Sequence, residues 1–251
     1  MDKASVFMLL CICHLLGDYF LQSEETAQKK MDDLAYYGKH IVQYAVPFTI
    51  LLFMERLCMG VWHWNWYVLS VGTHMGIDFV KRCYETQIRK KDKQIEAKTI
   101  ECYVVDQAAH FASILLVAIC CPVQFTDESG YLTKVIPYLL YFLSLLKPAN
   151  VTFKILFSQF QVTSNAKEEE KTDMPKTGAG AWIGNLERLL SGVLILLGQF
   201  SAVGLTMTAK SIARYDEIVK NPVFAEYYLI GTLYSILYTI SVYCLIFKLI
   251  L

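Results

Sequence analysis

Seven apolar stretches, each of about the length needed to cross a bilayer, restrict this chain to a small set of folds. They cover roughly residues 4–22, 34–57, 62–82, 99–121, 131–147, 182–205 and 224–248. Inside a bilayer every backbone polar group must find its partner within the protein, so spans of this length are helices. Hydrophobic residues make up 55% of the chain, which is high for a soluble domain. The sequence therefore predicts an all-α, polytopic transmembrane bundle of about seven spans.

Lys and Arg are distributed unevenly between the segments that connect these stretches. The connections around 23–39, 81–98 and 147–181, together with the C-terminus, hold sixteen of them, and the opposite side holds six. The six are Lys3, Arg56, Lys134, Lys210, Arg214 and Lys220. Because cytoplasmic loops carry the excess of basic residues, we expect the first side to be cytoplasmic. The formal net charge is zero, so no global field attracts nucleic acid.

Two polar segments separate a long front part from a short back part. Residues 148–162 begin with Pro148 and alternate apolar with polar residues, which predicts an amphipathic helix on the inner membrane surface. Residues 166–175 are strongly polar and predict a solvated linker. The predicted parts are a membrane bundle over 1–147, a cytoplasmic amphipathic segment and linker over 148–181, and a C-terminal transmembrane hairpin over 182–251.

Four of the five histidines fall at nearly the same predicted depth in the first four spans, and three of them have an aspartate four residues away. The pairs are His14 with Asp18, His74 with Asp78, and Asp106 with His110, while His40 has no such partner. A spacing of four places both members of a pair on one face of a helix. The order is reversed in the third pair, which lies on a span of opposite direction. All the aspartates are therefore expected on the cytoplasmic side of the imidazoles, which lie roughly 10–14 Å deep.

Ionisable groups are expensive inside a bilayer, so their convergence indicates a functional site. Imidazole and carboxylate ligands suit transition metals such as Zn, Mn or Fe. Seven candidate ligands exceed the needs of one tetrahedral ion, so the site holds either two metals or one metal with some aspartates outside its ligand shell. Asp18, Asp78 and Asp106 are also candidate catalytic bases. One pair alone would favour a buried hydrogen bond, but three pairs with His40 favour metal or proton chemistry.

Further polar residues are candidates for orienting the ligands or contacting a substrate. They are Gln22, Gln107, Lys81, Glu187, Arg188, Lys210 and Arg214. Glu187 and Arg188 are expected to form an internal ion pair near the site. Glycines flank the His/Asp motifs and would permit close helix approach; they are Gly17, Gly38, Gly72 and Gly76.

The segment after Gln199 has two interpretations. Lys210 and Arg214 either extend to the outer membrane surface, which the sequence favours, or belong to a re-entrant half-helix over 201–215. In the second case Lys210 enters the bundle, with Glu226 as its candidate partner.

The motifs also resemble those of a known family. The runs His-Leu-Leu-Gly-Asp-Tyr-Phe-Leu-Gln (14–22) and Asp-Gln-Ala-Ala-His (106–110), with the His74/Asp78 pair, resemble bacterial and phage polytopic membrane proteins of unknown function. The resemblance continues through 182–190, 209–214 and 228–232. It implies the bacterial inner membrane but no established activity. More distantly, the pattern is similar to that of membrane-bound metal-dependent hydrolases, which is an analogy only.

The residues favour an integral-membrane hydrolase that uses one or two divalent transition metals. It would act on a phosphoester or pyrophosphate from the cytoplasm or inner leaflet, so the expected partners are membrane lipid and a phosphorylated small molecule or lipid. Two alternatives stay open. One is a transporter or channel for divalent cations or protons, which an inverted repeat would favour. The other is a signalling or assembly protein with a structural metal. A homo-oligomer also stays open.

Overall fold

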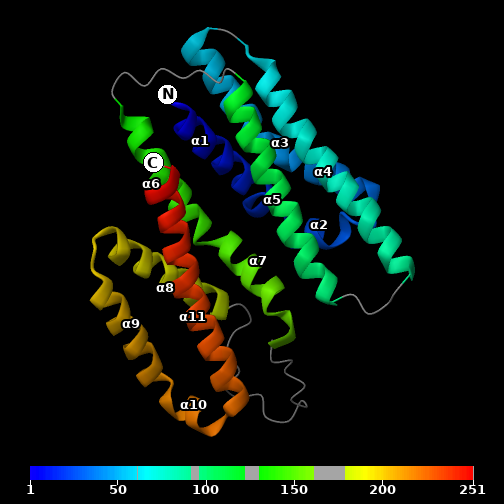
Figure 1. The fold of residues 1–251 in the computed structure, drawn as a ribbon. Helices are drawn as coiled ribbons and strands as arrows, with labels where there is room; N and C mark the ends of the chain where they lie inside the picture. Colours follow the sequence, from blue (N-terminus) through cyan, green and yellow to red (C-terminus); the bar gives the residue numbers. More distant parts are fainter. Residues whose placement is uncertain (61, 92–95, 122–129, 161–178, 251) are drawn as a thin grey trace. The chain divides into compact units, whose positions relative to one another are not determined.

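The computed structural model is all-α over the residues it describes, as predicted. The described residues are 1–60, 62–91, 96–121, 130–160 and 179–250 (Figure 1). Within these ranges the chain forms α-helices and short 3-10 and π-helical turns, with no strand. Contacts divide the chain into two compact units, Met1–Leu140 and Tyr141–Leu251, and each is described by itself. The boundary between the two units falls inside a helix.

The first unit packs three long helices and a shorter N-terminal helix around the predicted His/Asp cluster. Its elements are α1 (Lys3–Leu15), a π-helical turn (Leu16–Phe20), α2 (Glu24–Lys29), α3 (Leu34–Met59), α4 (Trp64–Lys91), α5 (Glu96–Cys120) and the start of α6 (Tyr131–Ser144). Helix α1 contacts α3 and α5, and α4 packs against both α3 and α5. The π-helical turn packs on α3.

Capping side chains fix where several of these helices begin. The carboxylate of Asp2 accepts a hydrogen bond from the backbone N–H of Ser5 at the start of α1. The hydroxyl of Ser23 accepts from the N–H of Thr26 at the start of α2, and the carboxylate of Asp33 accepts from the N–H of Ala35 at the start of α3. Each cap satisfies an N–H that has no partner within its helix. The short helix α2 is therefore held at a defined place before α3.

Five helical segments are long and apolar enough to cross a membrane. They are Lys3–Phe20, Leu34–Met59, Ile100–Cys120, Tyr131–Leu156 and Pro222–Ile250. The described residues thus support five of the seven predicted spans. Most of the stretch 62–82 lies in α4 (Trp64–Lys91), which is not among these five. The stretch 182–205 is interrupted and forms parts of two helices.

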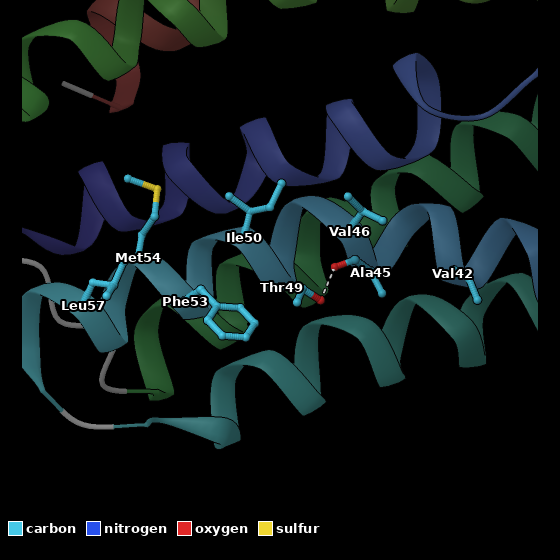
Figure 2. A pocket seen from close by; sticks show the side chains of 8 residues that line it. All are labelled: Val42, Ala45, Val46, Thr49, Ile50, Phe53, Met54 and Leu57. Atoms are coloured by element: carbon cyan, nitrogen blue, oxygen red, sulfur yellow. Dashed lines mark hydrogen bonds between the residues drawn. The ribbon is translucent and has the colours of Figure 1, made fainter.

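One face of α3 carries a shallow, open apolar groove (Figure 2). It is lined by Val42, Ala45, Val46, Thr49, Ile50, Phe53, Met54 and Leu57. Their spacing of three and four residues places them on one side of the helix. The hydroxyl of Thr49 donates to the carbonyl of Ala45 at 2.9 Å, so the one polar lining residue is satisfied within the helix. Such a face suits contact with lipid chains.

The second unit contains the end of α6 and the remaining helices. They are α7 (Lys147–Leu156), a 3-10 turn (Ser158–Phe160), α8 (Ala179–Leu196), α9 (Phe200–Ala213), α10 (Tyr215–Lys220), α11 (Pro222–Cys244) and a final π-helical turn (Leu245–Ile250). Helix α7 covers most of the predicted amphipathic segment. The predicted linker over 166–175 lies outside the described residues.

The predicted sixth span is broken, because the chain reverses direction after α8. Gly198 adopts a positive φ of 70°, which glycine tolerates without steric cost. Helix α9 then packs back along α8, and Lys210 Nζ lies 2.7 Å from Glu187 Oε2. Phe200–Ala213 therefore forms a separate helix, and the partner of Lys210 is Glu187 rather than Glu226. Lys210 and the residues after it lie towards the end of the hairpin where α8 begins, so their expected place on the opposite side is wrong.

Arg188 does not pair with Glu187, which corrects the expected internal ion pair. Its Nε donates to the carbonyl of Leu145 at 2.6 Å, and its Nη2 donates to the side-chain oxygens of Asn150 (2.5 Å) and Asn185 (2.8 Å). Leu145 lies in the break between α6 and α7, where a carbonyl lacks its usual helical partner. Arg188 therefore stabilises this break through three hydrogen bonds, which we call the clamp. Glu187 instead faces α9.

Helix α11 runs antiparallel to α6. The hydroxyl of Tyr141 donates to the carbonyl of Thr239 (3.4 Å), and that of Tyr238 donates to the carbonyl of Ser144 (3.2 Å). The residue numbers of the contacting pairs therefore increase along α6 and decrease along α11. The C-terminus therefore lies towards the end where α6 begins, opposite to the side expected from the sequence.

Candidate metal centre

The structure brings the four predicted histidines and the three aspartates into one buried cluster in the first unit. His14 comes from α1, His40 from α3, His74 and Asp78 from α4, and His110 and Asp106 from α5. Asp18 comes from the π-helical turn. The four imidazoles are 0–1% exposed. The carboxylates of Asp78 and Asp106 are buried as well, at 2% and 7% exposed.

Asp78 lies at the middle of the cluster and uses its two oxygens differently. Oδ2 is 3.0 Å from Lys30 Nζ and 3.1 Å from His40 Nε2. Oδ1 faces the other way and lies 3.8 Å from His110 Nε2. One carboxylate thus links two groups of nitrogen atoms.

Two sets of potential ligand atoms meet around Asp78, and they share His74. In the first set, atoms of Asp18, His40 and His74 lie within 4.8 Å of one another. In the second set, the same holds for His74, Asp78 and His110. Each set contains both imidazole nitrogen and carboxylate oxygen, the combination that suits transition metals.

The hydrogen bonds of His110 leave one nitrogen available as a ligand. Its Nδ1 lies 2.8 Å from the backbone carbonyl of Asp106. A carbonyl only accepts, so Nδ1 carries the proton and Nε2 carries the lone pair. This Nε2 is buried and has no hydrogen-bond partner among the described residues. A buried acceptor of this kind is costly unless it meets a cation or a donor.

His14 also has one ring nitrogen with a hydrogen-bond partner and one without. Its Nδ1 lies 3.3 Å from the hydroxyl of Tyr44, and its Nε2 has no hydrogen-bond partner in the described part of the chain. The His14 ring stacks on that of His110, with centroids 5.3 Å apart. These two unpartnered nitrogens belong to neighbouring, stacked rings, and Nδ1 of His74 likewise has no hydrogen-bond partner among the described residues.

His40 and His74 face each other through their Nε2 atoms, which are 3.1 Å apart. Two lone pairs at this distance repel, so the two nitrogens share a proton or a cation. The ring of His74 lies flat on that of Tyr44, with centroids 3.5 Å apart and an interplanar angle of 4°. Tyr44 therefore fixes the ring planes of His74 and, through its hydroxyl, of His14. Tyr44 carries no motif that would indicate this role in the sequence, although it lies one helical turn after His40.

Asp18 departs from the predicted helical pairing. His74 and Asp78, and likewise His110 and Asp106, lie within 4 Å of each other. No such contact is found between His14 and Asp18 among the described residues. The π-helical turn starts at Leu16 and changes the direction of the next side chains. Asp18 instead lies 3.5 Å from His40 Nε2.

Gly17 permits the close approach that positions this turn. A Cβ at Gly17 would lie 2.9 Å from Tyr44 Cα and 3.0 Å from its carbonyl oxygen. The other three glycines near the motifs, which are Gly38, Gly72 and Gly76, have nothing within 4 Å of a built Cβ. The expected role in helix approach therefore applies to Gly17 alone.

Lys30 is the principal residue that the sequence analysis missed. It follows α2, is buried, and directs Nζ towards Asp78 Oδ2 (3.0 Å), His40 Nε2 (3.2 Å) and Asp18 Oδ1 (3.7 Å). Burial alone would lower the pKa of Lys30, but the carboxylates of Asp18 and Asp78 raise it above its usual value. Lys30 is therefore an ammonium ion within the cluster. Its position in a polar connection gave no sign of this, because basic residues are common there anyway.

Three of the other predicted polar residues lie at the edge of the cluster. Lys81 Nζ lies 3.0 Å from Asp106 Oδ2. Gln107 donates to the same oxygen at 3.2 Å and accepts from the hydroxyl of Tyr19 at 2.9 Å. With its amide nitrogen turned towards Asp18, Gln22 donates to the carbonyl (2.8 Å) and to Oδ1 (3.3 Å) of that residue. Lys81, Gln107 and Gln22 thus hold carboxylates of the cluster, and Tyr19 extends the network.

The remaining predicted polar residues belong to the second unit. Glu187 and Lys210 form an ion pair there, Arg188 binds the α6–α7 break, and Arg214 Nη1 lies 2.9 Å from Glu217 Oε2. All four have partners within their own unit, so none is needed to complete the cluster.

Comparison with known proteins identifies a family but no activity. Residues 6–137, more than half of the 251 residues, match the family described as "Protein of unknown function (DUF3307)". The chain therefore belongs to this family. The match covers nearly all of the first unit and every residue of the cluster, whereas the motifs at 182–190, 209–214 and 228–232 lie outside it. No curated protein and no solved structure matches the chain.

Proposed function

We propose that this member of the family is an integral-membrane, metal-dependent hydrolase of a phosphoester or pyrophosphate. The observation that carries the proposal is the pairing of a buried imidazole–carboxylate set with two lysine ammonium groups. The set of His74, Asp78 and His110 offers ligand atoms to a divalent transition metal. The unpartnered Nε2 of His110 fits such an ion, since it would otherwise be a buried lone pair without a partner. A divalent ion there would polarise a phosphoryl oxygen and make a nearby water more acidic.

The charges of the cluster favour one metal ion over two. Asp18, Asp78 and Asp106 contribute three negative charges, and Lys30 and Lys81 contribute two positive charges. With neutral imidazoles the sum is one negative charge. One divalent ion changes the sum to one positive charge, which suits an anionic substrate, whereas two would leave an excess of three. Such an excess is costly where water is largely excluded.

Asp106 is the best candidate for a catalytic base. Its Oδ2 is held by Lys81 and Gln107, while its Oδ1 is buried and has no hydrogen-bond partner among the described residues. A carboxylate that is fixed through one oxygen can accept a proton from water on the other. Lys30 and Lys81 supply ammonium groups of the kind that bind phosphate oxygens.

The same lysines make a cation transporter the weaker proposal. Two ammonium groups lie against the carboxylates that a passing divalent ion would need, and they would repel it. A phosphorylated substrate would be attracted instead.

The direction of the helices supports a cytoplasmic site. If α8 begins in the cytoplasm, the α8–α9 hairpin places Lys210, Arg214 and Lys220 there too, and the α6–α11 pairing moves Lys248 outside. The basic residues then divide eighteen against four, leaving Arg188 in α8, instead of sixteen against six. This larger excess supports a cytoplasmic position for the connections around 23–39, 81–98 and 147–181, consistent with a bacterial inner membrane.

Activity in detergent, without any gradient, tests the proposal. Wild-type protein supplied with Mn²⁺ or Zn²⁺ should release phosphate from some member of a panel of lipid phosphates, isoprenoid pyrophosphates and nucleotides. Asp106→Asn should lose turnover by roughly 10²-fold or more, the usual contribution of a base. Asp78→Asn should lose turnover as well, because the metal site loses a charged ligand. Glu187→Gln is the matched control, since Glu187 is also a carboxylate paired with a lysine but lies in the other unit; it should retain turnover.

Metal flux would contradict the hydrolase. If sealed proteoliposomes take up Mn²⁺, if Asp78→Asn abolishes the uptake, and if no member of the panel is cleaved, the centre is a transport site. Stable metal binding with neither flux nor cleavage would indicate a structural metal.

A further inference from the structure

We propose that the ammonium group of Lys30 fills a second cation subsite of the centre, in the place where a two-metal hydrolase would hold its second ion. This inference rests on the proposed metal site formed by His74, Asp78 and His110. It assigns Asp18, His40 and the Oδ2 atom of Asp78 to a cation that the chain itself supplies.

The contacts of Lys30 match the requirements of an ammonium ion. An ammonium has three donors and no acceptor. Nζ donates to Asp78 Oδ2 at 3.0 Å, contacts His40 Nε2 at 3.2 Å, and lies 3.7 Å from Asp18 Oδ1 in a longer ion pair. Metal ligands would lie at about 2.0–2.2 Å, whereas N–H donors lie near 2.9 Å from their acceptors. The distances around Nζ therefore fit an ammonium group and are too long for metal–ligand bonds, although the surrounding atoms are of the kind that also bind metals.

Asp78 connects the two subsites as a bridging carboxylate does between two metals. Its Oδ2 contacts Lys30 Nζ, while its Oδ1 faces His110 Nε2. His74 also belongs to both sets of ligand atoms. In two-metal hydrolases the two ions lie about 4 Å apart, and both stabilise negative charge on the reacting oxygens. An ammonium in one of the positions provides positive charge without a second metal.

The neighbouring lysine shows that the burial of Lys30 is specific. Lys29 is exposed and pairs with Glu25 at 2.8 Å, four residues earlier on α2. Lys30 is 8% exposed and reaches the cluster. The hydroxyl of Ser23 caps α2, and Gln22, just before it, bonds to Asp18. The segment that carries Lys30 is thus tied to the cluster at its own start.

Removing the ammonium should open this subsite to a metal ion. Lys30→Ala leaves His40 Nε2 and one oxygen each of Asp18 and Asp78 without their shared donor. We expect wild-type protein in detergent to bind one Mn²⁺ per chain by equilibrium dialysis and to give the spectrum of an isolated ion by electron paramagnetic resonance. Lys30→Ala should bind two, with the altered spectrum of two coupled Mn²⁺ ions. Lys29→Ala is the matched control and should bind one.

The outcomes separate this inference from the proposed function. One Mn²⁺ in both wild type and Lys30→Ala would overturn the inference and leave the metal site intact. No Mn²⁺ in wild type but one in Lys30→Ala would overturn the resident metal and support the lysine as the native cation. No binding in either would overturn both. If Lys30→Ala does not fold, Lys30→Ser also removes the charge and is too short to fill the subsite, and the same stoichiometries decide.

Discussion

Replacement of Gly17 by Ala should destabilise the protein, because the new methyl group has no space. Its Cβ would lie 2.9 Å from Tyr44 Cα and 3.0 Å from the Tyr44 carbonyl oxygen. Ordinary carbon–carbon contacts are about 3.5–4.0 Å, and backbone atoms cannot rotate away as a side chain can. The π-helical turn must therefore separate from α3. Overpacking of this kind costs about 1–3 kcal/mol.

The expected change is large enough to measure by thermal unfolding in detergent. For a chain of this size, 1 kcal/mol shifts the midpoint by about 2–4 °C, so Gly17→Ala should lower it by roughly 2–12 °C. It should also weaken Mn²⁺ binding, because His14 bonds to Tyr44 and Asp18 follows Gly17 directly.

Gly72→Ala is the matched control for this prediction. Gly72 lies inside α4 with nothing within 4 Å of a built Cβ. Because alanine forms helix better than glycine, the midpoint should stay the same or rise by the equivalent of up to about 1 kcal/mol. If Gly17→Ala is as stable as Gly72→Ala and binds Mn²⁺ as wild type does, the close approach at Tyr44 does not position the centre.

Three further predictions concern an ion pair in the first unit, the Arg188 hydrogen bonds in the second unit, and the orientation in the membrane. Lys81→Met should destabilise the protein more than Lys81→Met combined with Asp106→Asn, since the single change leaves a buried carboxylate without its cation; equal losses in the thermal midpoint would argue against the pair. Arg188→Lys should lower the stability of the second unit by about 2–3 kcal/mol, because lysine lacks the planar fork that bonds to Leu145, Asn150 and Asn185; an unchanged unfolding midpoint would contradict the clamp. A cysteine at Asp216 in a cysteine-free background should react with an impermeant reagent from the cytoplasmic side, as should cysteines within 89–93 and 167–171, while one at Ile250 should react from outside; the opposite pattern would refute the orientation.

The centre was largely predictable from sequence, because its signal comes from regular helical spacing. His74 and Asp78, or Asp106 and His110, lie on one helix face whatever the neighbouring helices do. Reversed order on antiparallel helices then places the carboxylates together. Lys30 was not predictable in this way. Its connection could be identified as polar, but the direction of a lysine after a six-residue helix depends on the tertiary packing.

The hairpin of the second unit was missed for a different reason. Gly198 lies in an apolar run, and glycine is common in membrane helices, so it gave no clear sign of a reversal. Placing Lys210 on the opposite side followed from reading 182–205 as one span. A pairing between Glu187 and Lys210 becomes apparent only when the chain turns between them.

The clamp on the α6–α7 break has a consequence for how the chain is made. Leu145 and Arg188 are 43 residues apart, so at about 5–20 residues per second the carbonyl is synthesised roughly 2–9 s before the guanidinium that binds it. During this interval the kink has no fixed partner, and Pro148 cannot supply an N–H for a straight helix. We expect the nascent segment to enter the bilayer in more than one shape and to settle only when α8 arrives. If synthesis stops before Arg188, the truncated chain has no partner for the Leu145 carbonyl, and its α6–α7 break is not held in one shape. We expect membrane proteases to cleave this truncated chain faster than the full chain.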